Sequence, residues 1–169
     1  MLFTAGDFTV RRVNDADLPA ILQVYKQSED FLSLGPVPTA SLRMVKADLA
    51  LSAAHNGVYC LIVDRSDNAV GVLDFVPSIR NGVAELSLLM ISKLHLGKGT
   101  GTAVLQNLEA YLAKNHGITT LESGVQTNNT SAIRFWRSRG FQIGTQPISH
   151  NDGTVAYDMS KTIHRQPSV

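Results

Sequence analysis

The sequence predicts an α/β (α+β) fold with a mixed, mostly antiparallel central sheet of about seven strands, flanked by about four helices. Three apolar, strand-like runs follow one another at residues 59–64, 70–76 and 83–91, and short polar turns join them, so they predict an antiparallel meander. A helical pattern at residues 100–114 then separates the third run from another strand at 118–126. Because a helix connects these two strands, we expect them to lie parallel.

The remaining predicted elements lie before and after this block. Asn14 and Asp17 occupy the two polar positions of a capping box, which predicts the start of a helix. The segment at residues 31–38 holds one glycine and two prolines, which excludes a regular element there. We expect the tail from residue 164 to 169 to fray. The other predicted elements are a strand at 7–13, helices at 14–25, 39–55 and 129–139, and a C-terminal hairpin of strands 141–148 and 154–162.

Length and composition limit the classes of protein to consider. The 169 residues suit one domain, spanning residues 1–169, and 44% hydrophobic with 17% charged residues is typical of a globular chain. A net charge of +1 provides no field to hold nucleic acid or an anionic membrane. The single Cys60 excludes a disulfide framework within the chain and favours a reducing compartment, so we expect a cytoplasmic protein. The five histidines show no metal-ligand spacing, and no metal is expected.

The most informative stretch is the loop at residues 96–101, LGKGTG, which joins a strand to a helix. Gly97, Gly99 and Gly101 permit positive φ angles and leave the backbone N–H groups uncovered. The helix that follows adds its unpaired N-terminal N–H groups and the positive end of its dipole. A strand, a bare loop and a helix N-terminus in this order form a cradle for phosphate. The alternative is a connection that needs glycine only for its turns.

The spacing of the glycines distinguishes between kinds of phosphate loop. A nucleotide P-loop, G-x-x-x-x-G-K-[ST], would need a glycine at Ser92 and a hydroxyl residue at Gly99. A dinucleotide fingerprint, G-x-G-x-x-[GA], fails at Thr102 or at Val104, depending on the glycine from which it is counted. The loop instead resembles the [QR]-x-x-G-x-[GA] pyrophosphate loop of the GCN5-related N-acetyltransferases, the GNAT superfamily. It departs from that pattern at its first position, where Leu96 replaces Gln or Arg.

A second stretch, residues 125–141, independently resembles another GNAT signature, in which an asparagine precedes a helix that ends in Gly-Phe. The matching positions are Asn129, Ala132-Ile133, Phe135-Trp136 and Gly140-Phe141. The two motifs occur in the family's order, with the expected helix and strand between them. On these two motifs the chain is identified as a member of the superfamily.

The resemblance implies an acetyl-CoA site between the two parallel strands, which splay apart in this fold. The pyrophosphate would rest on the N–H groups of residues 97–102, and the pantetheine would run along residues 89–91 as a pseudo-strand. Asn129 would hydrogen-bond the pantetheine or the rest of the cofactor, while Phe135 and Trp136 would flank its thiol end. Lys98 either adds a phosphate contact or is a solvated lysine. The cofactor-binding residues implied in this way are Leu89, Met90, Ile91, Leu96, Gly97, Lys98, Gly99, Thr100, Gly101, Thr102, Asn129, Phe135 and Trp136.

Acetylation of an amine calls for a base, because an amine with a pKa near 10.4 is only about one part in two thousand deprotonated at pH 7. Glu85 is the candidate catalytic residue. It lies 11 residues before Leu96, the offset at which protein-lysine acetyltransferases of the superfamily place a glutamate base. Alternation along the strand predicts that Glu85 shares a face with Ser87 and Leu89. A structural carboxylate is the alternative role for Glu85, and Asp74 is the reserve candidate.

Two further steps of the reaction need a group on the protein or in the solvent. We expect the backbone N–H of Met90 or Ile91 to stabilise the oxyanion. Trp136 stands where many family members carry a tyrosine that protonates the leaving thiolate. A thiolate with a pKa near 8.5 lies only about 2 kcal/mol uphill at pH 7, so solvent can protonate it, with Tyr157 as a substitute acid. Trp136 is then a packing wall for the thioester or part of the core.

The sequence therefore predicts an acetyl-CoA-dependent N-acetyltransferase that moves the acetyl group directly, within a ternary complex, to a primary amine. A small-molecule acceptor is expected, with no nucleic acid or membrane partner, and a homodimer would cover the C-terminal edge strands. Glu29 and Asp30 either attract the amine or form a solvated helix end. The alternatives are a protein N-terminal or lysine acetyltransferase, a non-catalytic acyl-CoA-binding or sensor domain, and transfer of a longer acyl group.

Overall fold

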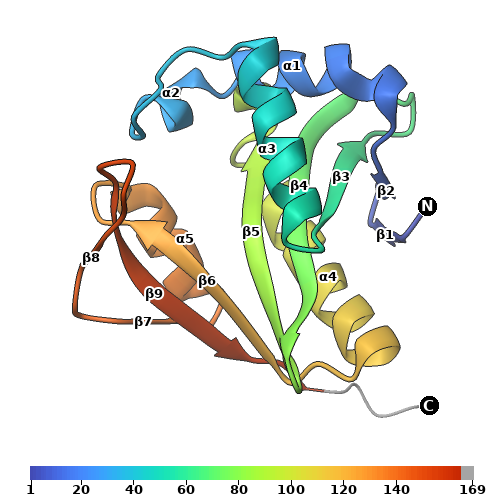
Figure 1. Cartoon of the computed structure of the whole chain (residues 1–169). Coiled ribbons are helices and arrows are strands. Elements are labelled where there is room, and N and C mark those ends of the chain that lie inside the picture. The colour runs from blue at the N-terminus through green and yellow to red at the C-terminus, as the bar shows by residue number, and fades with distance from the viewer. Residues whose placement is uncertain (165–169) are drawn as a thin grey trace.

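A single mixed sheet forms the centre of the computed structural model, which describes residues 1–164 (Figure 1). Nine strands join it in the order β1-β2-β3-β4-β5-β6-β9-β7, with β8 paired to β9. Within residues 1–164 every pairing is antiparallel except that of β5 with β6, as the connection through a helix predicted. The strands are β1 Phe3–Ala5, β2 Phe8–Arg12, β3 Val58–Val63, β4 Ala69–Arg80, β5 Val83–Ile91, β6 Thr120–Gln126, β7 Gln142–Ile143, β8 Ile148–Ser149 and β9 Val155–Thr162.

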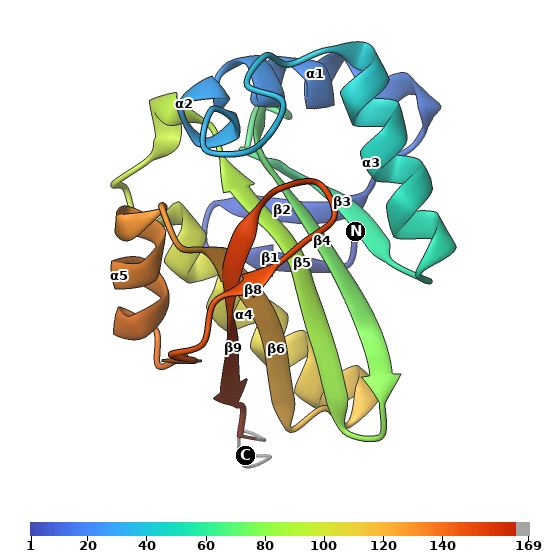
Figure 2. The same cartoon turned by 60° about the vertical axis from the view of Figure 1, so that its left-hand side comes forward.

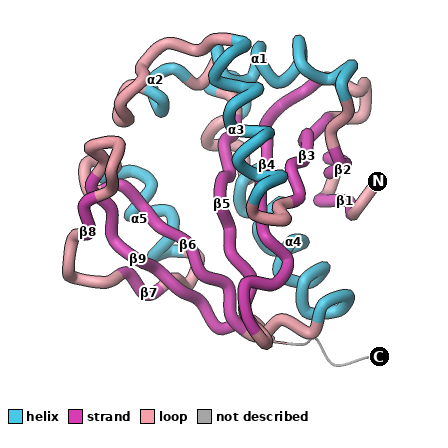
Figure 3. The backbone as a smooth tube through the Cα atoms, in the orientation of Figure 1, coloured by secondary structure: helices cyan, strands magenta, loops and turns pink. Residues whose placement is uncertain are grey.

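Helices cover both faces of the sheet (Figure 3). One buried cluster joins the sheet to α4 and α5, and a second, on the opposite face, joins it to α1 and α3. We call these the α4 face and the α3 face. The helices are α1 Leu18–Lys26, α2 Glu29–Leu32, α3 Leu42–Ala54, α4 Thr100–His116 and α5 Thr130–Ser138, with short 3₁₀ turns η1 Asp15–Asp17 and η2 Lys93–His95. The predicted fold class is confirmed.

The parallel strands β5 and β6 separate after a short paired section. They are in register only from Val83 to Glu85, which faces Glu122 on β6. One more link follows, in which Ser123 Oγ donates to the carbonyl of Leu86 at 2.6 Å. Beyond it, within residues 1–164, β6 pairs only with β9, and Figure 1 shows β5 and β6 meeting at the bottom of the view and diverging upward. The splay leaves the end of β5 without a ladder partner on its β6 side.

The start of the first helix is built as the capping box predicts. The Asn14 side chain accepts from the N–H of Ala16 at 2.9 Å, and the N–H of Asn14 donates to the Asp17 carboxylate at 2.8 Å. Arg11, at the end of β2, binds both oxygens of Asp17 at 2.8 and 2.9 Å. The Arg11 hydrogen bond lowers the pKa of Asp17, against its burial, which raises it. This pair fixes the angle at which α1 leaves the sheet.

Several predicted boundaries differ from the structure. The predicted strand at 7–13 is the second half of a hairpin, because Gly6, at φ +62°, turns the chain between β1 and β2. The predicted strand at 141–148 is divided into β7 and β8 by the segment from Gly144 to Pro147, since proline lacks a backbone donor. The predicted loop at 31–38 begins inside the short helix α2. The predicted fraying of the tail falls, from Arg165 onward, outside the described residues.

Candidate active site

The glycine loop leads into α4 with its backbone exposed. Gly97 and Gly99 have φ angles of +71° and +80°, so both need the freedom of glycine. A Cβ added to either would meet nothing within 4 Å, so the space beside both residues is open. Gly99 is the N-cap residue of α4 and provides no side-chain cap. The loop is therefore not filled by the protein's own side chains.

The polar groups of this loop lack partners. Among residues 1–164, the backbone N–H groups of residues 97–102 make no hydrogen bond to another protein group. The hydroxyl of Thr100 is also buried, at 2% exposure for the residue, and has no hydrogen-bond partner within that range. A buried donor without a partner is costly unless a ligand satisfies it. Six N–H groups and a hydroxyl at a helix N-terminus fit the diphosphate of acetyl-CoA.

Three elements come together next to the gap between β5 and β6. A Cβ built on Gly101, in the first turn of α4, would lie 3.6 Å from Phe135 Cζ and 3.7 Å from Ile91 Cγ1. The end of β5, the start of α4 and the middle of α5 therefore meet at Gly101. The structure thus brings together predicted cofactor-binding residues that are far apart in the sequence.

Trp136 and Asn129, two other predicted cofactor contacts, have structural roles. Trp136 is 8% exposed and packs edge-to-face between Phe135 and Phe141, with ring centroids 4.9 and 5.2 Å away. Asn129 caps α5, since its side-chain oxygen accepts from the N–H of Ala132 at 3.1 Å. Trp136 therefore belongs to the core, which was one of its two predicted roles. The two hydrogen bonds of the Asn129 side chain within residues 1–164 use its oxygen, and its amide nitrogen makes none.

A bulge in β5 changes which side chains share a face. Asp74 on β4 faces Leu88, but the next residue of β4 faces Leu86, so Ser87 has no partner in the ladder. Leu86 and Leu89 consequently both pack on the α4 face, whereas Leu88 and Met90 pack on the α3 face. The prediction that Glu85 and Leu89 share a face is wrong. Simple alternation fails there because two residues oppose one.

Glu85 lies on the α3 face, half-buried. It is opposite Val76 on β4 and Glu122 on β6, and Ser87 Oγ donates to its carboxylate at 3.2 Å. Glu122 is neutralised by an ion pair with Arg80. Among residues 1–164 no cationic side chain forms an ion pair with Glu85. The charge of Glu85 is therefore not balanced by an ion pair within the described residues.

Asp74, the reserve candidate, is buried beneath α3. It is 7% exposed, and Ser52 Oγ donates to its carboxylate at 2.7 Å. Burial raises the pKa of Asp74, and the charges of Asp48 and Glu85 raise it further, against the Ser52 hydrogen bond, which lowers it. The Ser52 hydrogen bond thus holds the Asp74 carboxylate in place, and the charge of Glu85 contributes to the raised pKa of Asp74.

A hydrogen-bonded network that the sequence did not predict lies next to Asp74. The hydroxyls of Tyr25 and Tyr59 are 2.6 Å apart, and Tyr25 donates to the carboxylate of Asp48 at 2.7 Å. Tyr59 is the register partner of Asp74 on the neighbouring strand. The contacts join residues 23 and 34 positions apart, so no local pattern signals them.

A cavity of about 320 Å³ lies beside the diverging strands, a size that suits a small ligand. Three distant segments form it: the loop after α2, the end of β6 and the β8–β9 turn, which Figure 2 shows arching toward the side of α2. Asn128 Nδ2 donates to the carbonyl of Leu34 at 3.1 Å and closes one side. The lining residues are Leu34, Gly35, Pro36, Gln126, Thr127, Asn128, Asp152, Gly153, Thr154 and Val155.

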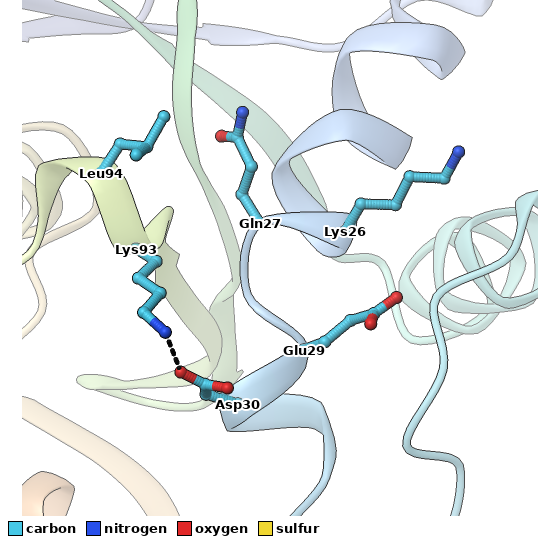
Figure 4. Close-up of a pocket in the computed structure, with 6 residues that line it drawn as sticks. All are labelled: Lys26, Gln27, Glu29, Asp30, Lys93 and Leu94. Carbon is cyan, nitrogen blue, oxygen red and sulfur yellow. Dashed lines mark hydrogen bonds and ion pairs between the residues drawn. The ribbon is translucent and has the colours of Figure 1, made fainter.

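A second hollow, of about 310 Å³, contains the acidic residues predicted either to attract an amine or to end a helix (Figure 4). Asp30 accepts from Lys93 Nζ at 2.7 Å, and Glu29, which points away from this pair, accepts from the N–H of Ala40 at 3.2 Å. Both carboxylates are thus engaged by the protein. The Lys93–Asp30 pair ties α2 to the segment that follows β5.

The remaining predicted positions lie around the loop. Leu96, in the place of the family's Gln or Arg, is 59% exposed, and Lys98 is exposed beside it. Thr102 lies in the first turn of α4 and Tyr157 on β9, where it packs against the core of the α4 face. His95 Nδ1 is 2.8 Å from Ser92 Oγ. In the described part of the chain no group of three His, Cys, Asp or Glu side chains is arranged to hold a metal ion, and no helix is long and apolar enough to cross a membrane.

Solved structures share this architecture. The spermidine N-acetyltransferase of Vibrio cholerae, solved with CoA and spermine, superposes with a TM-score of 0.73 at 16% identity, over 94% of this chain and 96% of that one. An acetyltransferase from Thermus thermophilus gives 0.76 at 22% identity, over 95% and 99%. The ribosomal-protein-S18-alanine N-acetyltransferase of Escherichia coli gives 0.67 at 20% identity, over 96% and 98%. At these identities the likeness shows the fold alone.

The sequence itself matches a family model. A search of curated proteins finds no match. The model of the acetyltransferase (GNAT) family, however, matches residues 21–141, which is more than half of the chain and includes both motifs and the splayed strands. The chain therefore belongs to the GNAT family of acetyl-CoA-dependent N-acetyltransferases.

Proposed function

We propose that the chain is a single N-acetyltransferase domain that binds acetyl-CoA between β5 and β6 and acetylates a primary amine of a small molecule directly, in a ternary complex. The observation that carries this proposal is that, among residues 1–164, the N–H groups of residues 97–102 and the buried Thr100 hydroxyl have no hydrogen-bond partner. When bound, acetyl-CoA supplies the activated acetyl thioester. Residues 89–91, at the unpaired end of β5, and Asn129 and Phe135 on the α5 side complete the proposed site, with Leu96 and Lys98 at its rim and Trp136 packed behind Phe135 in the core.

Glu85 is the proposed base. It takes a proton from the ammonium form of the acceptor, which leaves the nitrogen lone pair free to attack. Its position on the α3 face, without an ion-pair partner in the described residues, supports this role. A backbone N–H of Met90 or Ile91 donates to the developing oxyanion. Solvent or Tyr157 returns a proton to the thiolate.

The acceptor is proposed to be a cationic small molecule. Glu85 is half-buried on the α3 face and within residues 1–164 forms no ion pair, so its carboxylate can attract an ammonium group. The 320 Å³ cavity beside the splay accommodates a small body attached to the amine. Neighbours named for spermidine and for an alanine of ribosomal protein S18 show that the fold serves both small-molecule and protein acceptors.

A thiol-release assay tests the proposal. Acetyl-CoA is offered with a panel of small amines, amino acids and peptides with free N-termini or lysines, and free CoA is measured against pH. We expect release with at least one small amine and a loss of about 10²–10⁴-fold in kcat/KM for Glu85→Gln. Release only with peptides supports the protein acetyltransferase. Binding of acetyl-CoA without release for every acceptor supports the sensor domain, and release only with longer acyl-CoA supports the third alternative.

We also propose that the protein is cytoplasmic and forms a homodimer. Burial raises the pKa of the Cys60 thiol to about 12, so this cysteine stays a thiol, which suits the reducing cytoplasm. The sheet ends at the two-residue strand β7, and a homodimer that covers this edge is proposed. Sedimentation equilibrium distinguishes a dimer from a monomer.

A further inference from the structure

The splay between β5 and β6 opens at Ser87. Glu85 is still in register with Glu122 on β6, and within residues 1–164 the bond from Ser123 Oγ to the carbonyl of Leu86, at 2.6 Å, is the last link between the two strands. Ser87 is the next residue of β5, and the bulge leaves it without a ladder partner on β4 as well. It is therefore the first residue of β5 that borders the open part of the splay, and its side chain is exposed.

Glu85, the proposed base, lies in the closed part. Its neighbours across the ladder are Val76 on β4 and Glu122 on β6, and Glu122 forms an ion pair with Arg80. The proposed path of the pantetheine begins four residues further along β5, at Leu89, which in an extended strand is up to about 13 Å away between Cα atoms. Proton transfer needs direct hydrogen-bond contact or one intervening group. An intervening hydroxyl or water therefore gives Glu85 its shortest route to the acceptor nitrogen.

The side chain of Ser87 provides such a hydroxyl. Ser87 Oγ donates to the Glu85 carboxylate at 3.2 Å. Within residues 1–164 this is the hydrogen bond that the hydroxyl makes, and its oxygen keeps lone pairs that can accept another. A hydroxyl that donates to the base and accepts from an ammonium group joins the two. The proton path thus runs along β5 from the open splay to its closed end.

We infer that Ser87 is a catalytic residue that relays the proton of the acceptor's ammonium group to Glu85. The inference rests on the proposed function of Glu85. In this step an N–H bond of the ammonium group breaks, its electron pair stays on nitrogen, and the proton bonds to Ser87 Oγ. The original O–H bond of Ser87 breaks at the same time, and that proton bonds to the Glu85 carboxylate. The serine is regenerated, and the neutral amine attacks the thioester.

Kinetics of three variants test the relay, with the amine of the panel that gives the fastest CoA release. Ser87→Ala should lower kcat/KM by about 10–100-fold, less than Glu85→Gln, because water can take the place of the hydroxyl. Ser87→Thr keeps the hydroxyl and suits a strand, so its kcat/KM should stay within about threefold of the wild type. Ser78→Ala is the matched control and should leave the rate unchanged. Ser78 is also an exposed strand serine, and its hydroxyl donates to a group two residues away, the carbonyl of Arg80, at 3.4 Å.

Two readouts separate a relay from a structural role. Tm and the Kd for CoA of Ser87→Ala should match those of Ser78→Ala, because the relay acts on the proton and not on the cofactor. In a Glu85→Gln background, Ser87→Ala should have no further effect on kcat/KM, because the relayed proton then has no acceptor.

Several outcomes would overturn the relay alone. These are an unchanged kcat/KM of Ser87→Ala, a threonine variant as slow as the alanine variant, a loss of CoA affinity that matches the loss of rate, and losses that multiply in the double variant. In each of these cases an impaired Glu85→Gln still supports Glu85 as the base. If Glu85→Gln keeps full activity, the proposed base is wrong and the relay is overturned with it.

Discussion

Gly99→Ala tests the cradle at the start of α4 most sharply. Gly99 has φ +80°, and a Cβ there meets nothing within 4 Å, so the substitution adds no clash within the described protein. The substitution lowers the free energy of unfolding by about 1 kcal/mol, because alanine is strained in the left-handed conformation. For a chain of 169 residues this lowers Tm by about 2–4 °C.

The effect on CoA binding should be larger than the effect on stability. Alanine relaxes toward φ near +57°, about 20° from the present angle, and turns the following N–H away. Its methyl group also covers part of the cradle. Loss of one hydrogen bond between an N–H and a charged phosphate costs about 1.5–3 kcal/mol, which raises Kd about 10–150-fold.

Gly6→Ala is the matched control. Gly6 also lies in the left-handed region, at φ +62°, with nothing within 4 Å of an added Cβ, but it turns the β1–β2 hairpin. Calorimetric titration with CoA and thermal denaturation of both variants separate strain from binding. We expect similar falls in Tm and a raised Kd only for Gly99→Ala. A Kd of Gly99→Ala within twofold of the wild type would refute the assignment of the loop.

Two further predictions concern stability. Asp17→Asn should lower the free energy of unfolding at pH 7 by about 2 kcal/mol, because it weakens the Arg11 pair and the Asn14 cap. Since the pKa of Asp17 is lowered in the folded state, its contribution is complete above the unfolded pKa near 3.9 and is lost as pH falls through the folded value, so urea unfolding of variant and wild type should converge at acidic pH. Trp136→Ala should cost about 3–5 kcal/mol in urea unfolding, because it leaves a cavity between Phe135 and Phe141. An unchanged stability with an altered KM would instead make Trp136 a wall of the thioester site.

Features with local causes could be predicted from the sequence. The capping box at Asn14 and the positive φ angles of the glycine loop follow from the conformational properties of a few adjacent residues, and the structure has both. The parallel pairing of β5 with β6 follows from the helix between them.

Features set by pairing between distant segments could not be predicted. The bulge at Ser87 exists because β4 and β5 shift register, so alternation within β5 alone assigns Leu89 to the wrong face. The contact between Tyr25 and Tyr59 depends on how α1 is placed over β3. The surroundings of Asp74 likewise come from distant segments, since Ser52 lies on α3 and its ladder partner Tyr59 on β3.

The most direct test of the central claim is an amide NMR titration of the ¹⁵N-labelled chain with CoA. The proposed site predicts saturable binding, with the largest shifts in the amides of residues 97–102 and smaller ones at the end of β5. Absence of binding, or shifts that leave residues 97–102 unchanged, would contradict it.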